Sequence, residues 1–152
     1  DKVSLGERIN NDLKAAMLGG DRFCVEVLRG IKATILNEEV SSGKRDTGLE
    51  DSVIEQLIAK EVKKRNESAE VYDGASRPEL AENERLEAKI LCGYLPKQLS
   101  EDEIKLVIKQ TITGLGVSSA SAMGQVIGAV KKELGNSADG SIIARLVKEA
   151  LN

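Results

Sequence analysis

The stretch Tyr94-Leu95-Pro96-Lys97-Gln98-Leu99-Ser100 separates two regions of different helical character. Long, heavily charged segments precede it, whereas shorter segments rich in Gly, Ser and Ala follow it. Pro96 has no backbone N–H and biases the residue before it away from helical geometry. A helix that arrives from Glu79 should therefore end near Tyr94.

A new helix is predicted immediately after this break. Ser100 and Glu103 have the spacing of a capping box, in which the serine hydroxyl accepts a free helical N–H and the glutamate reaches back. We therefore expect two domains, an N-terminal helical domain over residues 1–96 and a C-terminal three-helix domain over residues 97–152.

Composition favours an all-α protein. The 152 residues include one Phe, two Tyr, no Trp and two Pro, so the core must be built from aliphatic side chains. Abundant Glu, Lys, Ala and Leu are typical of helices.

Four helices are predicted before the break, at about residues 5–18, 21–40, 52–72 and 79–94. The last two should form a long antiparallel hairpin. Asp21 and Asp51 are the expected caps of the second and third helices, and the segment from Ser76 should cap the fourth. The expected buried side of the fourth helix consists of Leu80, Leu86, Ile90, Leu91 and Tyr94.

Three short helices are predicted after the break. The first ends at Gly114-Leu115-Gly116, the second spans about residues 121–134, and the third begins after Asp139. Leu106 lies almost opposite the apolar face of the first of these helices. We therefore expect the Leu106 side chain either to be exposed or to contact another helix.

Several function classes have little support. The chain has no His, and Cys24 and Cys92 fall within aliphatic helical patterns, so we expect no catalytic centre, no metal site and no cofactor. No apolar run approaches the ~20 residues that span a bilayer. The expected location is the cytoplasm, or an organelle if a leader has been removed.

Charge is unevenly distributed. The net charge is −3, but from Ile104 onward six Lys/Arg face three Asp/Glu, which is compatible with nucleic-acid binding. A second basic cluster, Lys60 with Lys63-Lys64-Arg65, is interrupted by glutamates. It indicates a solvated helix face, with nucleic-acid contact as the alternative.

Glycines recur on one side of the segment at 121–134. Gly124, Gly128, Lys131 and Gly135 lie together beside the apolar face. Glycine inside a helix costs about 1 kcal/mol relative to Ala, so a compensating reason is required. Either another helix packs closely on this side, or an elongated ligand such as a phosphate backbone lies along it. Gly135 has a third explanation, as a C-cap.

Several motifs together resemble the GatB/YqeY family. They are Leu5-x-x-Arg8-Ile9-x-x-Asp12-Leu13-Lys14-Ala15-Ala16-Met17, Glu61-Val62-Lys63-Lys64-Arg65, the break at residues 94–100, Met123-Gly124-Gln125-Val126-Ile127-Gly128, and Ala138-Asp139-Gly140. The N-terminal motifs are similar to those of the stand-alone YqeY-like proteins. The C-terminal motifs are similar to the tail of the B subunit of the glutamine-dependent aspartyl/glutamyl-tRNA amidotransferase.

This resemblance implies a tRNA-binding or amidotransferase-associated adaptor that lacks the large catalytic domain of that enzyme. Partners implied are tRNA and proteins of the amidotransferase or tRNA-synthetase type, with no membrane and no defined oligomeric state. A protein-interaction module and a glutamine-dependent carbon–nitrogen ligase are the alternatives. The candidate RNA-binding residues are Gly124, Gln125, Gly128, Lys131, Lys132, Arg145 and Lys148.

Overall fold

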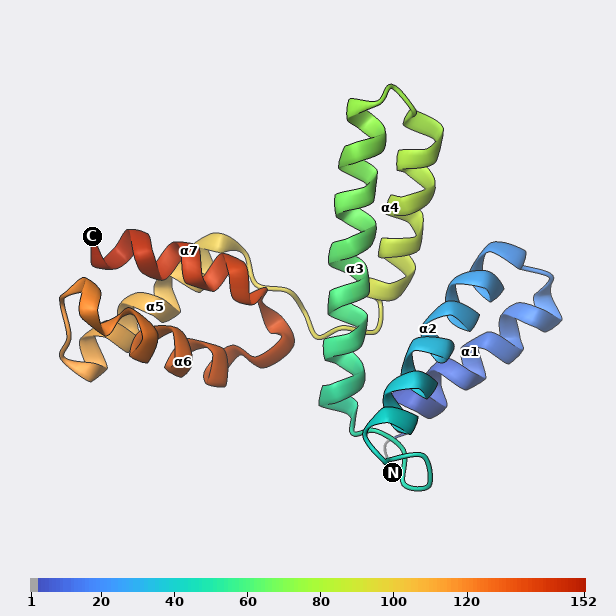
Figure 1. Cartoon of the computed structure of the whole chain (residues 1–152), viewed down its shortest axis with the longest axis horizontal. Helices are drawn as coiled ribbons and strands as arrows, with labels where there is room; N and C mark the ends of the chain where they lie inside the picture. Colours follow the sequence, from blue (N-terminus) through green and yellow to red (C-terminus); the bar gives the residue numbers. More distant parts are fainter. Residues whose placement is uncertain (1–2) are drawn as a thin grey trace. The chain divides into compact units, whose positions relative to one another are not determined.

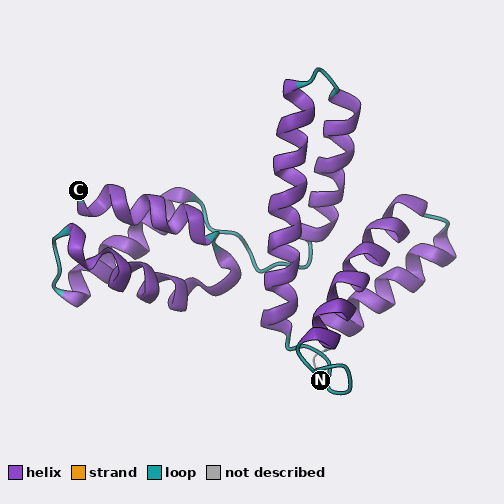
Figure 2. Ribbon diagram, in the orientation of Figure 1, coloured by secondary structure: helices purple, strands orange, loops and turns teal. Residues whose placement is uncertain are grey.

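The computed structural model describes residues 3–152, and within that range it contains helices and no β-strand, as the composition predicts (Figures 1 and 2). The elements are α1 (Leu5–Gly19), α2 (Arg22–Ser41), α3 (Asp51–Gly74), α4 (Pro78–Cys92), α5 (Glu101–Leu115), the 3₁₀ turn η1 (Ala120–Ala122), α6 (Met123–Leu134), the 3₁₀ turn η2 (Gly135–Ser137) and α7 (Gly140–Leu151). None of the described helices is both long and apolar enough to cross a membrane.

Internal contacts divide the chain into two compact units, Asp1–Leu95 and Pro96–Asn152. Each unit has its own aliphatic core, and no residue is shared between the two cores.

The N-terminal unit is built from two helical hairpins, α1–α2 and α3–α4 (Figure 1). Gly20 makes the first turn possible because it adopts φ +71°, which favours glycine. The largest fully buried side chains of this unit come from α1, α2 and α3, and they are Ile9, Leu28, Ile31 and Ile58. Leu28 and Ile31, three positions apart, share one face of α2.

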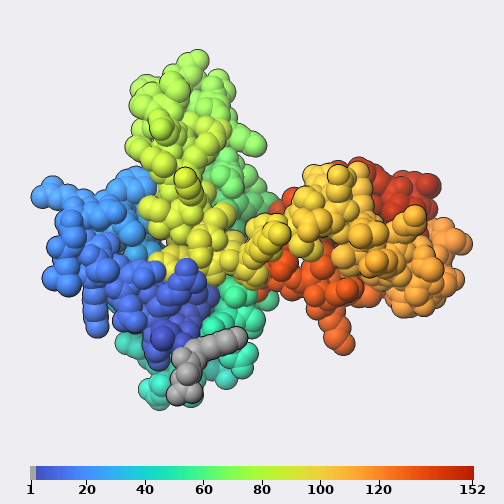
Figure 3. All heavy atoms as spheres, turned by 180° about the vertical axis from the view of Figure 1, so that it is seen from behind, coloured from blue at the N-terminus to red at the C-terminus, as the bar shows by residue number. Residues whose placement is uncertain are grey.

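The long hairpin α3–α4 is confirmed, but its interface differs from the prediction. Its buried residues include Ala69, Ala81 and Ala88, whereas Leu80 and Leu86 are 37% and 43% exposed. Small side chains let the two helices approach closely, and this rotates the larger leucines toward solvent. Figure 3 shows the far end of the hairpin as a narrow column projecting from the rest of its unit.

Arg65 joins the two helices of this hairpin. It pairs with Glu61 at 3.1 Å on its own helix, and with Glu84 at 3.2 Å and Glu87 at 3.5 Å on α4. The Arg65 side chain is only 24% exposed. This member of the predicted basic cluster is therefore occupied by carboxylates of its own unit.

Two predicted helix caps are wrong. Asp51 is the first residue of α3 and not its cap, and its carboxylate instead accepts the Leu5 backbone N–H at 3.0 Å, which ties α3 to the start of α1. Ser76 adopts φ +59°, and α4 begins after Arg77 with no side-chain cap and with Pro78 in its first turn. The Asp21 cap is confirmed, since its carboxylate accepts the Cys24 N–H at 3.1 Å.

The C-terminal unit packs α5, α6 and α7 around a second aliphatic core. Its most buried side chains are Ile104, Ile108, Val126, Val130, Ile143 and Val147. Both hydrogen bonds of the predicted capping box between Ser100 and Glu103 are present. The residues before α5 belong to this unit as well, because Leu99 N–H donates to the Ser137 carbonyl at 2.9 Å.

Candidate nucleic-acid interface

Helix α6 carries most of the candidate residues, and its buried side fixes which of them face outward. Val126 and Val130 are fully buried, and Met123, Ile127 and Leu134 pack partly against the same core. With 3.6 residues per turn, these positions hold one face of α6 against α5 and α7. The opposite face is left for residues that the core does not use.

Gly124 and Gly128 lie on the outward face and are exposed. A Cβ built on either residue would have no neighbouring atom within 4 Å. Packing of another described helix of the C-terminal unit against these glycines therefore does not explain their alignment. The explanations that remain are a helix from outside this unit and an elongated ligand.

Gly135 is explained locally. It is the C-cap of α6 with φ +52°, a conformation that side-chain-bearing residues rarely adopt. The row of glycines thus reduces to Gly124 and Gly128.

Lys131 extends this row by one turn, because positions i, i+4 and i+7 share a helix face. Its side chain turns toward the start of α7. A Cβ built on Gly140 would lie 3.1 Å from Lys131 Cε and 3.3 Å from Nζ. The contact places a positive charge where α6 and α7 meet.

Gln125 and Lys132 form a second row beside the glycines, also seven residues apart. Both side chains are exposed. Among the described residues, Lys132 makes no ion pair, so its charge is available to an external anion. The outward face of α6 therefore combines open backbone with two lysines.

Arg145 is placed differently. Its guanidinium pairs with Glu101 at 2.6 Å, on the first turn of α5, and with Glu149 at 3.3 Å on α7. Hydrogen bonding to Glu101 raises the pKa of Arg145 further above its ordinary value. Arg145 thus lies on the α5 side of α7 with its charge compensated, and it is separated from the α6 row.

Lys148 is exposed in the last turn of α7, and no ion pair of the described chain involves it. The structure therefore brings five candidates together on α6, namely Gly124, Gln125, Gly128, Lys131 and Lys132. It leaves Arg145 and Lys148 on another helix.

The thiols show little sign of catalytic activation. Burial raises the pKa of both Cys24 and Cys92, which lowers the fraction of reactive thiolate. Within residues 3–152, no group of three or more His, Cys, Asp and Glu side chains is arranged to hold a metal ion.

Two hollows were missed by the sequence reasoning. One, of about 690 Å³, lies in the N-terminal unit and includes Lys32 and Arg45 in its lining. The other, of about 420 Å³, runs between α5 and α7 with Lys105 and Lys109 at its edge. The sequence gives only one sign of these hollows, which is a lysine or arginine at positions whose pattern indicates a solvated surface.

Comparisons with known proteins agree with the motifs. Residues 6–151 match the family model described as Yqey-like protein. Three similar curated proteins share the name "Altered inheritance of mitochondria protein 41, mitochondrial".

These relatives cover most of the chain. The protein of Pyrenophora tritici-repentis is 29% identical over 95% of this chain and 79% of its own length. That of Kluyveromyces lactis is 33% identical over 80% of this chain and 66% of its own length. That of Lachancea thermotolerans is 30% identical over 74% of this chain and 60% of its own length. The chain therefore belongs to the YqeY-like family.

Proposed function

We propose that this protein is a tRNA-binding adaptor that uses the outward face of α6 and has no catalytic centre of its own. The single observation that supports this most is the open space above Gly124 and Gly128 beside two exposed lysines. Two helix-interior glycines cost about 2 kcal/mol in total. Among the described residues of the C-terminal unit, no close contact at either glycine offsets that cost.

The arrangement suits a phosphate backbone. Without side chains at Gly124 and Gly128, a ribose-phosphate strand can approach the helix backbone, while Lys131 and Lys132 neutralise phosphates. With three aromatic residues in the chain, stacking on unpaired bases has little to contribute, so recognition should depend on the shape and charge of folded RNA.

The proposed partner proteins follow from the family motifs. An adaptor of this kind would hold tRNA near an amidotransferase or a tRNA-synthetase-type enzyme that supplies the chemistry. Because the curated relatives are named as mitochondrial proteins, we extend the proposal to an organellar tRNA pool. The cytoplasm is the alternative location.

Titration of the full chain with purified tRNA at two salt concentrations tests the proposal. Lys131→Glu with Lys132→Glu should weaken binding and reduce the slope of log affinity against log salt by roughly 0.7–0.9 per lost phosphate contact. Gly124→Leu with Gly128→Leu should weaken binding through sterics and leave the salt slope nearly unchanged.

A matched control changes the same number of charges elsewhere. Lys60→Glu with Lys64→Glu alters two exposed lysines on α3 and should leave tRNA affinity nearly unchanged. Equal losses from the α3 and α6 pairs would mean that binding follows total charge and not this face. Absence of binding by the unmodified chain at low salt would also contradict the proposal.

A protein-interaction module is the second candidate, favoured by Leu106. This side chain is 57% exposed on α5, where it contributes nothing to the core. If a protein partner docks there, Leu106→Glu should abolish a complex with that partner, and the two lysine reversals on α6 should leave it intact.

A further inference from the structure

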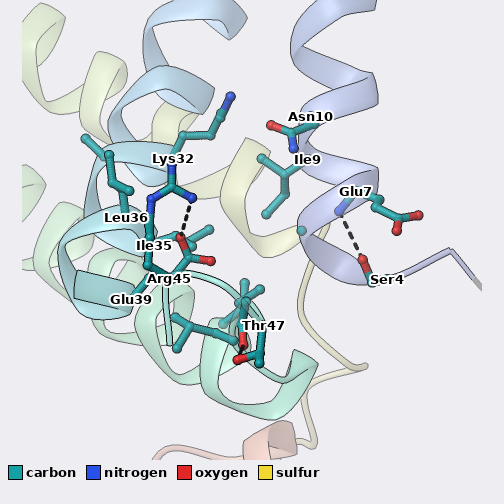
Figure 4. Close-up of a pocket in the computed structure, with 15 residues that line it drawn as sticks. Ser4, Glu7, Ile9, Asn10, Lys32, Ile35, Leu36, Glu39, Arg45 and Thr47 are labelled. Atoms are coloured by element: carbon teal, nitrogen blue, oxygen red, sulfur yellow. Dashed lines mark hydrogen bonds and ion pairs between the residues drawn. The ribbon is translucent and has the colours of Figure 1, made fainter. Parts of the chain in front are cut away.

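A hollow of the N-terminal unit lies between the first turns of α1, the C-terminal half of α2 and the loop that joins α2 to α3 (Figure 4). Its volume of about 690 Å³ falls in the range of small-molecule sites in proteins. None of the candidate RNA-binding residues lines it.

The floor of the hollow is aliphatic. Ile9, Ile35 and Ile54 reach it from three different helices and are buried in the core below. Leu36 and Leu49 continue the apolar lining toward the opening. An apolar molecular body would therefore be removed from water in this position.

The polar residues gather at the rim. Figure 4 shows the side chains of Lys32 and Asn10 reaching toward the same edge of the hollow from α2 and α1. Arg45 reaches over it from the loop, and its guanidinium lies 3.9 Å from the Glu39 carboxylate. At that distance the pair leaves most of the arginine donors unused.

The loop is held in place at this rim. Lys44 N–H donates to the Glu39 carbonyl at 2.8 Å, and Gly48 N–H donates to the Lys44 carbonyl at 2.8 Å. Gly48 adopts φ +77°, which lets the chain turn back against α2. The loop thus forms a wall of the hollow, with Arg45, Thr47, Gly48 and Leu49 in its lining.

The charges that face the opening are positive on balance. Glu39 is engaged by Arg45, and Figure 4 shows the Glu7 carboxylate directed away from the hollow. Lys32 makes no ion pair within the described chain.

We infer that this hollow binds an organic anion: an aliphatic or aromatic body carrying one carboxylate or phosphate group. The body would lie on Ile9, Ile35 and Ile54, and the anionic head would contact Lys32, Asn10 and Arg45. An anion is favoured over a neutral ligand because covering Lys32 without a counter-charge would leave its ammonium group partly desolvated and unpaired.

Calorimetric titration of the full chain with decanoate and with decyl phosphate tests the inference. Comparing the two titrations distinguishes a carboxylate from a phosphate head group. We expect saturable binding of at least one probe with one site per chain. Lys32→Ala with Arg45→Ala should weaken it at least about tenfold, because two charge-assisted contacts are lost. The matched control, Lys14→Ala with Lys44→Ala, removes two exposed cations outside the hollow and should bind normally.

A second variant fills the space without deleting a contact. Ala33 is exposed on α2 and lines the hollow, so Ala33→Trp should abolish probe binding, whereas Ala15→Trp on α1 should not. Helicity measured by circular dichroism checks that both variants are folded. Binding that survives Ala33→Trp, or that is lost on Lys105→Ala with Lys109→Ala in the other hollow, would overturn the inference, as would absence of saturable binding.

Discussion

The hydroxyl of Tyr94 donates a hydrogen bond of 2.5 Å to the carboxylate of Asp12, which ties the end of α4 to the middle of α1. Arg8, one turn earlier on α1, lies 4.7 Å from the centre of the same ring and donates to the Gly93 carbonyl at 3.0 Å. Residues 82 positions apart in sequence thus close the N-terminal unit. Arg8, Asp12 and Tyr94 belong to the motifs that identify the family, and here their role is structural.

Removal of this hydroxyl should destabilise the N-terminal unit. Tyr94→Phe keeps the ring in its buried position but deletes a hydrogen bond to a charged acceptor, so we expect a loss of about 1–2 kcal/mol in the free energy of unfolding. Urea denaturation followed by circular dichroism measures it. Tyr72→Phe is the matched control, since Tyr72 is half-buried and its hydroxyl has no hydrogen-bond partner in the described chain. Equal stability of the two variants would contradict this role.

Burial and the bond to Asp12 also raise the pKa of Tyr94 above its ordinary value of 10. A raised pKa means that the folded state holds the proton more tightly than the unfolded state. The resulting stabilisation is complete below about pH 10 and should be lost as the pH rises above it. We therefore expect the free energy of unfolding, measured by urea denaturation, to fall less steeply between about pH 9 and about pH 11 in Tyr94→Phe than in the unmodified chain.

The alanines of the α3–α4 hairpin provide the second prediction. Ala81 is fully buried where the two helices approach closely, so Ala81→Leu should overpack the interface and lower the free energy of unfolding by about 1–3 kcal/mol. Leu80→Ala, at the neighbouring exposed position, should change stability by less than about 1 kcal/mol. If both changes were equally damaging, the hairpin would not be packed through its alanines.

This hairpin shows what the sequence could and could not predict. The helical periodicity and the break at Pro96 were sufficient to place every helix to within a few residues. Leu91 and Tyr94 are buried, as their pattern predicts. Further toward the start of α4, hydrophobicity predicts the wrong residues, because close approach selects Ala81 and Ala88 over Leu80 and Leu86. Side-chain size at an interface depends on the partner helix, which the local sequence does not contain.

The caps show the same limit. Ser100, Asp21 and Asp139 each accept a backbone N–H of their own helix, as local geometry predicts. Asp51 satisfies a backbone N–H of α1 instead, because the fold brings another helix terminus within reach. The sequence also could not predict whether Gly124 and Gly128 are exposed, because their exposure depends on whether another helix covers them.

Those glycines give the third prediction. Because a Cβ at Gly124 or Gly128 meets open space, Gly124→Ala and Gly128→Ala should each stabilise the C-terminal unit by roughly 0.5–1 kcal/mol. Gly135→Ala is the contrasting control and should destabilise it, because Gly135 adopts φ +52°. Thermal unfolding of the three variants measures these effects. Destabilisation by Gly124→Ala would show that its surroundings are not open.

The capping box at the start of α5 gives a pH prediction. Hydrogen bonds from the Ser100 backbone and side chain lower the pKa of Glu103 below its ordinary value of 4.5. A lowered pKa contributes stability that is present above the unfolded pKa and is lost as the pH falls through the folded pKa. The protection factors of the amides in the first turn of α5, which correct for the intrinsic pH dependence of hydrogen exchange, should therefore fall below about pH 4.5.

The matched variants are Glu103→Gln and Glu133→Gln. The side-chain amide oxygen of Glu103→Gln can still accept the Ser100 N–H but does not titrate, so the loss of protection at low pH should be smaller than in the unmodified chain. Glu133→Gln, an exposed change on α6, should retain the full loss of protection. Identical pH profiles for all three proteins would contradict a contribution from the capping box.

The pair between Arg145 and Glu101 provides a test of whether α7 takes part in RNA binding. At present the Arg145 charge is compensated by Glu101 and Glu149, so a phosphate must displace carboxylates to reach it. Glu101→Gln removes the closer carboxylate. If α7 contacts the RNA, this change should raise tRNA affinity and steepen the salt dependence by roughly 0.7–0.9 in log–log slope, equivalent to one additional phosphate contact.

Asp102→Asn is the matched control, since it removes one negative charge from the same turn of α5 without touching Arg145. A gain of affinity that is the same for both variants reflects net charge alone and excludes a direct contact by Arg145. A gain confined to Glu101→Gln extends the interface from the α6 row to α7, because only that substitution frees the guanidinium. No gain from either variant confines the interface to α6 and leaves the Arg145 pairs as a structural link between α5 and α7.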